Sequence, residues 1–234
     1  RHSFPTRRSS DLITGGEIMS IKGVIFDLDG VIVSTDEYHY KAWKAMAVEE
    51  DICFDYEINH RLRGVSRMES LEIILEKAKK TYTAEEKIGL ANKKNDIYVE
   101  LLGRIGPKDI FPGVRQLIDS LKKLGIKLAI GSSSKNAVKI LDKIGLNNYF
   151  DAVADGNQIV YSKPNPEVFL LASKLFGVAP EYCAVVEDAE AGIEAAISAN
   201  MKAIAVGSAC NSSVANLRST RSEERRVGKE CLCS

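Results

Sequence analysis

Short, mostly apolar runs alternate along the second half of the chain with segments in which apolar residues recur every three or four positions. The short runs lie at 127–131, 150–154, 183–187 and 202–206, and an earlier one lies at 21–27. The segments with helical spacing lie at 114–124, 135–144, 166–176 and 189–200. Short apolar runs are typical of strands buried on both faces, and helices between them favour right-handed crossovers. The pattern predicts an α/β fold with a doubly wound, Rossmann-like parallel sheet.

A different pattern fills the segment from 36 to 103. Apolar residues recur there at helical spacing in 36–49, 67–78 and 84–102, with no strand-like run among them. Thr83, followed three residues later by Glu86, matches a capping box, and Gly103 is typical of a helix end. The sequence therefore predicts an all-helical cap domain inserted after the first strand. We assign the cap to 36–108 and the α/β core to 19–35 and 109–217.

Both ends of the chain lack such patterns. Residues 1–18 and 221–234 show no periodicity, and both can be read from complementary strands of one DNA sequence that resembles a sequencing-library adaptor. We interpret both segments as non-native tails and expect the native residues to begin at Met19. We expect the tails to pack against nothing, and the sheet to end at the 202–206 strand or shortly after it.

Composition and charge exclude several classes of protein. Of the 234 residues, 45% are hydrophobic and 27% are charged, which is ordinary for a globular chain. Basic and acidic residues each number 32, and this balance argues against nucleic-acid binding. No apolar run approaches the roughly 20 residues that span a bilayer, and five cysteines without paired spacing favour a reducing compartment. We expect a cytoplasmic protein that binds neither nucleic acid nor membranes.

Two carboxylates follow the first predicted strand, at Asp27 and Asp29. Ligands of open α/β sheets bind at the carboxyl ends of the strands, so these acids should lie at the ligand edge. Two close carboxylates raise each other's pKa unless a cation neutralises them, and oxygen ligands suit Mg²⁺. Without the buried strand before it, the pair would be interpreted as an ordinary solvated acidic turn.

Other chemically useful residues follow the later strands: Ser132, Lys163, Glu187 and Asp188. Each has an ordinary interpretation by itself. Ser132 could be a helix N-cap, Lys163 a solvated loop lysine, and the Glu187–Asp188 pair acids favoured at a helix start. Together with Asp27 and Asp29 they supply a nucleophile, an acid/base, a cation site and a phosphate-neutralising lysine. Phosphoryl transfer requires these parts.

Asp27–Ile32, Ser132, Lys163 and Glu187–Asp188, in this order, resemble the motifs of the haloacid dehalogenase superfamily. The helical block after the first motif is similar to the small helical cap of that superfamily. Four further segments resemble those of its sugar-phosphate mutases: Thr35–Trp43, Arg63–Ser70, Lys93–Asp96 and Ser132–Asn136. The resemblance covers about 20–208, and its cap segments are more specific than its core motifs.

The resemblance implies a role for each core residue. It makes Asp27 the phosphorylated nucleophile and Asp29 the general acid/base. It implies that Mg²⁺ is held by Asp27, the backbone carbonyl of Asp29, Asp188 and Glu187. Ser132 and Lys163 would hold the transferring phosphate.

The resemblance also implies that the cap contacts the substrate. Arg67, Ser134 and Asn136 would hold the non-reacting phosphate, and His39 and Lys94 would contact the sugar or couple cap closure to Asp29. Thr35, Arg63, Gly64 and Ser70 complete the expected substrate and cap residues. Without the family, His39 is equally well interpreted as an ordinary exposed helix residue, and Lys94 is better interpreted as part of a solvated helix face. Two positions depart from the family pattern: Arg63 stands where the family often has Lys, and Ala189 where it often has Ser.

The implied activity is interconversion of β-D-glucose 1-phosphate and glucose 6-phosphate through a phospho-aspartyl enzyme and a bisphosphate intermediate. We expect a monomeric isomerase that uses Mg²⁺ and small sugar phosphates. Two alternatives remain open: a sugar-phosphate phosphatase of the same superfamily, and a non-catalytic phosphosugar-binding protein. The cap segments favour the mutase over the phosphatase, and the presence of both Asp27 and Asp29 argues against the non-catalytic protein.

Overall fold

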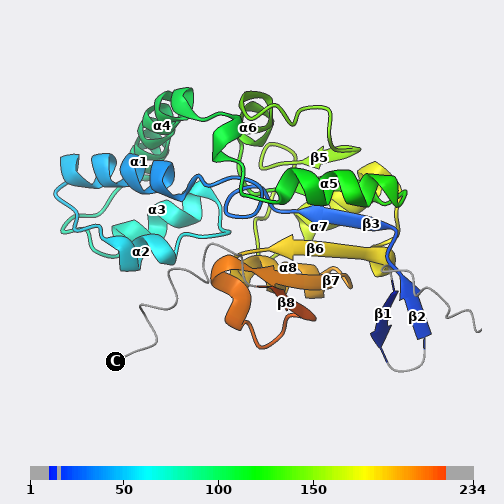
Figure 1. Ribbon diagram of the computed structural model, residues 1–234. Helices are drawn as coiled ribbons and strands as arrows, with labels where there is room; N and C mark the ends of the chain where they lie inside the picture. The colour runs from blue at the N-terminus through cyan, green and yellow to red at the C-terminus, as the bar shows by residue number, and fades with distance from the viewer. Residues whose placement is uncertain (1–10, 15–16, 220–234) are drawn as a thin grey trace, which may run out of the picture.

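A computed structural model describes residues 11–14 and 17–219. Its main sheet has six strands in the order β5–β4–β3–β6–β7–β8, and every neighbouring pair is parallel (Figure 1). The strands are β3 (Gly23–Phe26), β4 (Lys127–Gly131), β5 (Ala152–Ala154), β6 (Cys183–Glu187), β7 (Lys202–Val206) and β8 (Leu217–Ser219). All residues of β3 and β6 are buried, as expected for strands covered on both faces. The predicted α/β fold class is confirmed.

Two pairs of helices cover the two faces of this sheet. They are α5 (Val114–Lys123) and α6 (Ala137–Lys143) on one face, and α7 (Glu167–Phe176) and α8 (Glu190–Ser198) on the other. Ile118 and Ile140 belong to the apolar cluster on the first face, whereas Phe169 and Ile193 belong to the cluster on the second. In the sheet, β4 and then β5 lie on one side of β3, and β6, β7 and β8 follow one another on its other side. This reversal of strand order places a crevice at the carboxyl ends of β3, β4 and β6.

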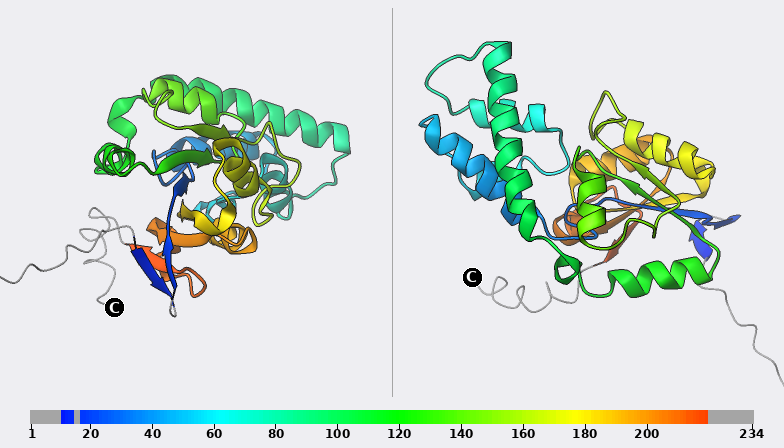
Figure 2. Two further views of the ribbon diagram at one scale, coloured as in Figure 1. Left: turned by 90° about the vertical axis from the view of Figure 1, so that its right-hand side faces the viewer. Right: turned by 90° about the horizontal axis from the view of Figure 1, so that it is seen from above.

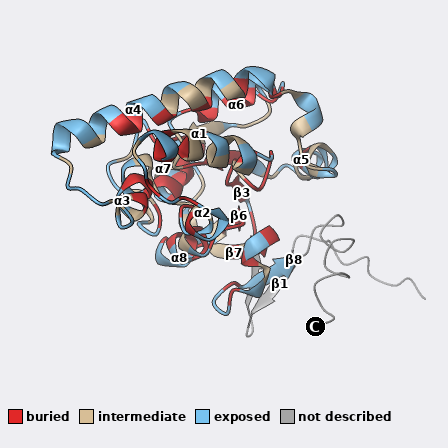
Figure 3. Cartoon of the chain, turned by 90° about the vertical axis from the view of Figure 1, so that its left-hand side faces the viewer, coloured by how far each residue is buried: buried red, intermediate tan, exposed pale blue. Residues whose placement is uncertain are grey.

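Four helices form a separate lobe beyond that crevice (Figures 1 and 2). They are α1 (Asp36–Glu49), α2 (Tyr56–His60), α3 (Arg67–Leu75) and α4 (Ala84–Leu101). Their inner faces bury a third apolar cluster that includes Trp43, Phe54 and Leu71, while much of the outer surface of α4 is exposed (Figure 3). Two linkers join the lobes and run side by side, because Phe111 donates its backbone hydrogen bond to Ile32 and Ser34 donates to Asp109. Short 3₁₀ turns complete the chain at Leu102–Arg104, Pro107–Asp109, Pro180–Tyr182 and Gly207–Asn211.

Several local predictions can be compared with these elements. The capping box of Thr83 and Glu86 is present at the start of α4, which ends at Leu101 and continues through Gly103 as a 3₁₀ turn. The short helix α2 was not predicted, nor was β8, whose three residues are all exposed and so lack an apolar run. The Lys163–Pro164 peptide bond is cis. None of the helices in the described part of the chain is long and apolar enough to cross a membrane.

The expected tails fall largely outside the structure. Residues 1–10, 15–16 and 220–234 are not among the described residues, so the interpretation of 221–234 lies outside them. Within the other expected tail, β1 (Asp11–Thr14) pairs with β2 (Glu17–Ser20) as an antiparallel two-stranded sheet. In the described residues this pair is separate from the six-stranded sheet. The domain boundaries at 18, 35 and 108 stay predictions.

Candidate active site

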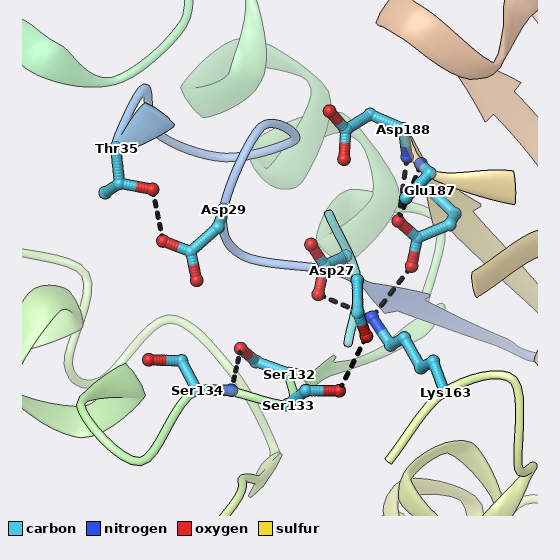
Figure 4. A network of polar contacts seen from close by, with 11 residues as sticks. Asp27, Asp29, Thr35, Ser132, Ser133, Ser134, Lys163, Glu187 and Asp188 are labelled. Atoms are coloured by element: carbon cyan, nitrogen blue, oxygen red, sulfur yellow. Dashed lines mark hydrogen bonds and ion pairs between the residues drawn. The ribbon is translucent and has the colours of Figure 1, made fainter. Parts of the chain in front are cut away.

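Asp27 and Asp29 lie where the central strand β3 ends, inside the crevice (Figure 4). The backbone of Asp27 continues the β3–β6 pairing, because its N–H donates to the Val186 carbonyl at 3.0 Å. The chain then turns at Gly30, which has a φ of +82°. A Cβ on Gly30 would lie 2.3 Å from Asp188 Oδ2, so only glycine fits both the conformation and the space. The β3–β6 pairing brings the ends of the two strands together, and the turn at Gly30 leaves room for the Asp188 carboxylate beside it.

Three buried carboxylates lie close together at this point, and two of them pair with one buried lysine (Figure 4). Lys163 Nζ donates to Asp27 Oδ1 at 2.7 Å and to Glu187 Oε2 at 2.8 Å, and its side chain is fully buried. The other Glu187 oxygen accepts the backbone N–H groups of Asp188 and Ala189, each at 3.0 Å. Asp27, Glu187 and Asp188 each offer an oxygen within 4.8 Å of the others. We call these three acids the acidic cluster.

The acidic cluster has more negative charge than Lys163 can balance. Burial raises the pKa of Glu187 to about 7 although Lys163 opposes it, and burial raises the pKa of Asp188 well above its ordinary value. Burial also disfavours the charged form of Lys163, but the charges of Asp27 and Glu187 outweigh it and raise the pKa of that lysine. Converging buried oxygens with an excess of negative charge fit Mg²⁺, so these acids could hold that ion.

Asp29 contacts Thr35 in the first linker and His39 in the cap instead of Lys163. The Thr35 hydroxyl donates to Asp29 Oδ1, and His39 Nε2 lies 3.9 Å from the same oxygen. Lys94 Nζ then lies 3.0 Å from His39 Nδ1. Burial and the charge of Asp27 raise the pKa of Asp29 to about 7, and burial lowers the pKa of His39 well below its ordinary value. Asp29 can therefore either give or take a proton near neutral pH.

A second polar group lies where cap helix α4 meets the core. Arg67 Nη2 donates to Asn95 Oδ1 at 2.8 Å, and Asn136 Nδ2 donates to the same oxygen at 3.0 Å. On the core side, the Ser132 hydroxyl accepts the backbone N–H of Ser134 at 3.1 Å, and the Ser134 hydroxyl accepts that of Asn136 at 3.2 Å. A guanidinium and side-chain amides are suited to an anion.

One cavity of about 480 Å³ joins these groups. Of the site residues predicted from the sequence, all except Thr35 and Glu187 line it, and Thr35 is bonded to Asp29 while Glu187 is bonded to Lys163. Ser70 is buried in the cavity wall, and the Gly64 carbonyl accepts a hydrogen bond from the Ser133 hydroxyl at 3.2 Å. Arg63 contacts Asp36 and Ser208.

Sequence reasoning missed two residues of this region. Asn95 joins Arg67 to Asn136, and its place directly after Lys94 in a recognised cap segment was a usable signal. Ser208 bonds Arg63 from a 3₁₀ turn 145 residues away, and no motif marks it.

Comparison with known proteins supports the family expectation. A model of the haloacid dehalogenase-like hydrolase family matches residues 21–200. The chain is 47% identical over 189 residues to a beta-phosphoglucomutase of Bacillus subtilis, covering 80% of this chain and 84% of that protein. It is 32% identical over 187 residues to a phosphorylated carbohydrates phosphatase of Thermotoga maritima, covering 79% and 84%. A solved structure of beta-phosphoglucomutase from Clostridium difficile matches with a TM-score of 0.83 at 40% identity, covering 90% and 96%.

These matches agree with the order of motifs, the parallel sheet and the helical lobe at the crevice. The family model alone covers well over half of the chain. The chain therefore belongs to the haloacid dehalogenase-like hydrolase family.

Proposed function

We propose that this chain is a phosphomutase that interconverts β-D-glucose 1-phosphate and glucose 6-phosphate. One observation carries the proposal: a single cavity holds two polar clusters suited to phosphate. One lies around Asp27 and Lys163, and the other around Arg67 and Asn136. A substrate with two phosphates, or one phosphate and one hydroxyl, would occupy both. The two beta-phosphoglucomutases among the compared proteins have the activity that this arrangement suits.

In the first half-reaction, a carboxylate oxygen of Asp27 forms a bond to the phosphorus of the bound bisphosphate. The bond between phosphorus and the sugar oxygen breaks, and Asp29 gives its proton to that oxygen. Lys163 and Ser132 hold the transferring group, while Arg67, Ser134 and Asn136 hold the distal phosphate. A pKa near 7 suits Asp29 for this task, because a useful fraction of it is protonated at neutral pH.

After glucose 6-phosphate leaves, β-glucose 1-phosphate binds, and the second half-reaction runs the same steps backwards at its 6-hydroxyl, which restores the bisphosphate. Asp29 takes the proton of the attacking hydroxyl, whose oxygen bonds to phosphorus while the aspartyl oxygen–phosphorus bond breaks. Positioning and charge neutralisation supply most of the acceleration. Asp27, Glu187, Asp188 and the Asp29 carbonyl would hold Mg²⁺, which neutralises charge on the transferring phosphoryl group when bound.

The alternative function is a sugar-phosphate phosphatase, in which water accepts the phosphoryl group from Asp27. The phosphatase of Thermotoga maritima among the relatives gives this alternative its support. A phosphatase that acts on a monophosphate needs no group to hold a second phosphate. The contacts of Arg67 with Asn95 and of Asn95 with Asn136 therefore favour the mutase.

Replacing Arg67 with alanine tests this distinction. We expect R67A to lose about 2–4 kcal/mol of transition-state stabilisation for glucose 6-phosphate formation, because a partly buried charged contact to the distal phosphate is lost. Slow hydrolysis of phospho-Asp27 should change far less, because water uses no distal phosphate. Both rates are measured with β-glucose 1-phosphate and a trace of bisphosphate.

The matched control is R61A, since Arg61 makes an exposed bidentate pair with Glu76 inside the cap. It should alter neither rate. If both rates fall together in R67A, or neither falls, the phosphatase becomes the better explanation. If the unmodified chain binds the sugar phosphates but forms neither product, the non-catalytic function is correct.

The same proposal includes a monomer in a reducing, cytoplasmic compartment. Among the described residues, Cys53 and Cys183 are free thiols, which supports that compartment. Sedimentation at several concentrations tests the monomer: a mass that rises with concentration would contradict it.

A further inference from the structure

Three residues of the cap loop that precedes α3 contact the core: Gly64, Ser66 and Arg63. The Gly64 carbonyl accepts from Ser133, and the Ser66 N–H donates to the Ser162 hydroxyl at 3.2 Å. A Cβ on Gly64 would lie 3.2 Å from the Ala189 Cβ, so the backbone of this loop lies directly on the loop that follows the acidic cluster. The third contact is made by Arg63 and is the strongest in chemical type, because it is charged.

Arg63 uses its two terminal nitrogens on two different partners. Nη1 donates to the Ser208 hydroxyl at 2.6 Å, and Nη2 pairs with the carboxylate of Asp36, the first residue of α1. Nε of Arg63 is buried and has no hydrogen-bond partner among the described residues, so these two contacts position the guanidinium. We call Arg63, Asp36 and Ser208 the Arg63 bridge. A lysine has one compact charge and cannot reproduce this fork.

Ser208 connects the bridge to the acidic cluster. The Ser208 hydroxyl donates its single proton to the Asp188 carbonyl at 2.5 Å. The same oxygen accepts from Arg63, so both roles of the hydroxyl are used. Arg63 Nη1 also lies 4.0 Å from Asp188 Oδ2. The cap loop is thereby tied to the backbone of a residue that lies beside Asp27.

We propose that Ser208 is a positioning residue that, through Arg63, holds the cap loop on the core. In this way it sets the ratio in which the phosphoryl group of phospho-Asp27 is transferred to a sugar hydroxyl and to water. The proposal rests on the proposed mutase function. Ser208 does not line the cavity of about 480 Å³ and acts through Arg63 and the Asp188 backbone. The family resemblance gave Ser208 no role, and the unusual arginine at 63 is the residue that makes the bridge possible.

The competing step is hydrolysis of phospho-Asp27. In it, a water oxygen bonds to phosphorus, the aspartyl oxygen–phosphorus bond breaks, and the proton of the water passes to Asp29. Free phosphate leaves and the Asp27 carboxylate is restored. Transfer to sugar uses the same atoms with a sugar hydroxyl in place of water. A cap loop held on the core keeps water away from phospho-Asp27, so transfer to the sugar is favoured over hydrolysis.

The test compares S208A, S208T and R63K with the control R61K. S208A loses the hydroxyl, S208T keeps it, and R63K keeps the charge but loses the fork. R61K changes an arginine of the same segment whose partner, Glu76, lies within the cap. The first measurement is free phosphate formed per glucose 6-phosphate. The second is hydrogen exchange of the amides at 64–66, which requires no activity and includes the Ser66 N–H that bonds to the core.

We expect S208A and R63K to raise the ratio of phosphate to glucose 6-phosphate by about two- to fivefold, the range for a partly exposed charged contact. Exchange at 64–66 should accelerate by a similar factor, S208T should restore both readouts, and R61K should change neither. Unchanged exchange in S208A, or faster exchange with an unchanged ratio, would overturn the proposal. If the unmodified chain makes no glucose 6-phosphate, the mutase function has failed, and the exchange measurement alone still decides whether Ser208 holds the cap loop.

Discussion

Replacing Lys94 with methionine should make the protein more stable while reducing its activity. Lys94 is only 3% exposed, and its Nζ lies 3.0 Å from His39 Nδ1. Its charge also faces two aromatic rings, with Nζ 4.8 Å from the centre of Trp43 and 4.6 Å from the centre of Tyr98. Among its charged neighbours, Arg67 repels the ammonium group. Methionine has nearly the same length and keeps the apolar packing without a charge.

The magnitude follows from the pKa of this lysine. Burial, followed by the charge of Arg67, lowers the pKa of Lys94 from 10.5 to about 7. At about 1.4 kcal/mol per pH unit, that difference corresponds to a destabilisation of about 4–5 kcal/mol when the lysine is charged in the unfolded chain. Cation–π contacts with the two desolvated rings stabilise the charged lysine in the folded protein by about 1 kcal/mol each or slightly more. The net gain expected for K94M at pH 7 is therefore about 2 kcal/mol.

The gain should depend on pH with a definite sign. Because the pKa is lower in the folded protein than in the unfolded chain, the unfolded chain binds the additional proton between about pH 7 and 10.5. The destabilisation by Lys94 is complete below about pH 7 and disappears as the pH rises toward 10.5. The advantage of K94M should therefore shrink over that interval. At each pH, the free energy of unfolding of wild type is subtracted from that of K94M. This difference removes the titration of the groups that both proteins share.

Urea unfolding at pH 7, 8, 9 and 10, with EDTA to remove divalent ions, measures this difference. The control is K93M, because Lys93 is the adjacent lysine but lies at the surface in an ion pair with Glu49. K93M should give no gain and no dependence on pH beyond that of wild type. A K94M protein that is less stable at pH 7, or whose advantage is the same from pH 7 to 10, would refute the reasoning. Glucose 6-phosphate formation should fall in K94M, since the family resemblance implies that Lys94 contacts the sugar or couples cap closure to Asp29.

Three further substitutions have direct consequences. D27N should abolish turnover and weaken Mg²⁺ binding, because an amide is a poor nucleophile and a weaker ligand; more than a few per cent of wild-type activity would remove Asp27 from that role. D29N should still bind Mg²⁺, measured calorimetrically, but should lose a factor of about 10²–10⁴ in turnover with the loss of proton transfer; unchanged turnover would contradict the acid/base assignment. G192A should displace Glu187, because a Cβ there would lie 2.0 Å from Glu187 Oε2; unchanged Mg²⁺ affinity and melting temperature would show that Gly192 is not required.

Local sequence determined the elements and the chemistry of the core. The strands could be predicted because a strand buried on both faces needs a mostly apolar run, as in β3 and β6. The capping box at Thr83 is local as well, since its partners are three residues apart. Asp27 and Asp29 could be placed at the ligand edge because the carboxyl end of a parallel strand is defined by chain direction alone. The family resemblance then added the expected roles of the cap residues.

Only the tertiary structure decided which of these residues meet. The order of strands depends on packing across the whole sheet, and β8 was missed because its three exposed residues have no apolar signal. Lys94 could be interpreted from sequence as a solvated lysine, yet the cap buries it against two rings. Ser208 has no local feature that links it to Arg63, 145 residues earlier. A hydrogen bond between distant residues depends on the position of two backbones after folding, and neither short segment contains that information.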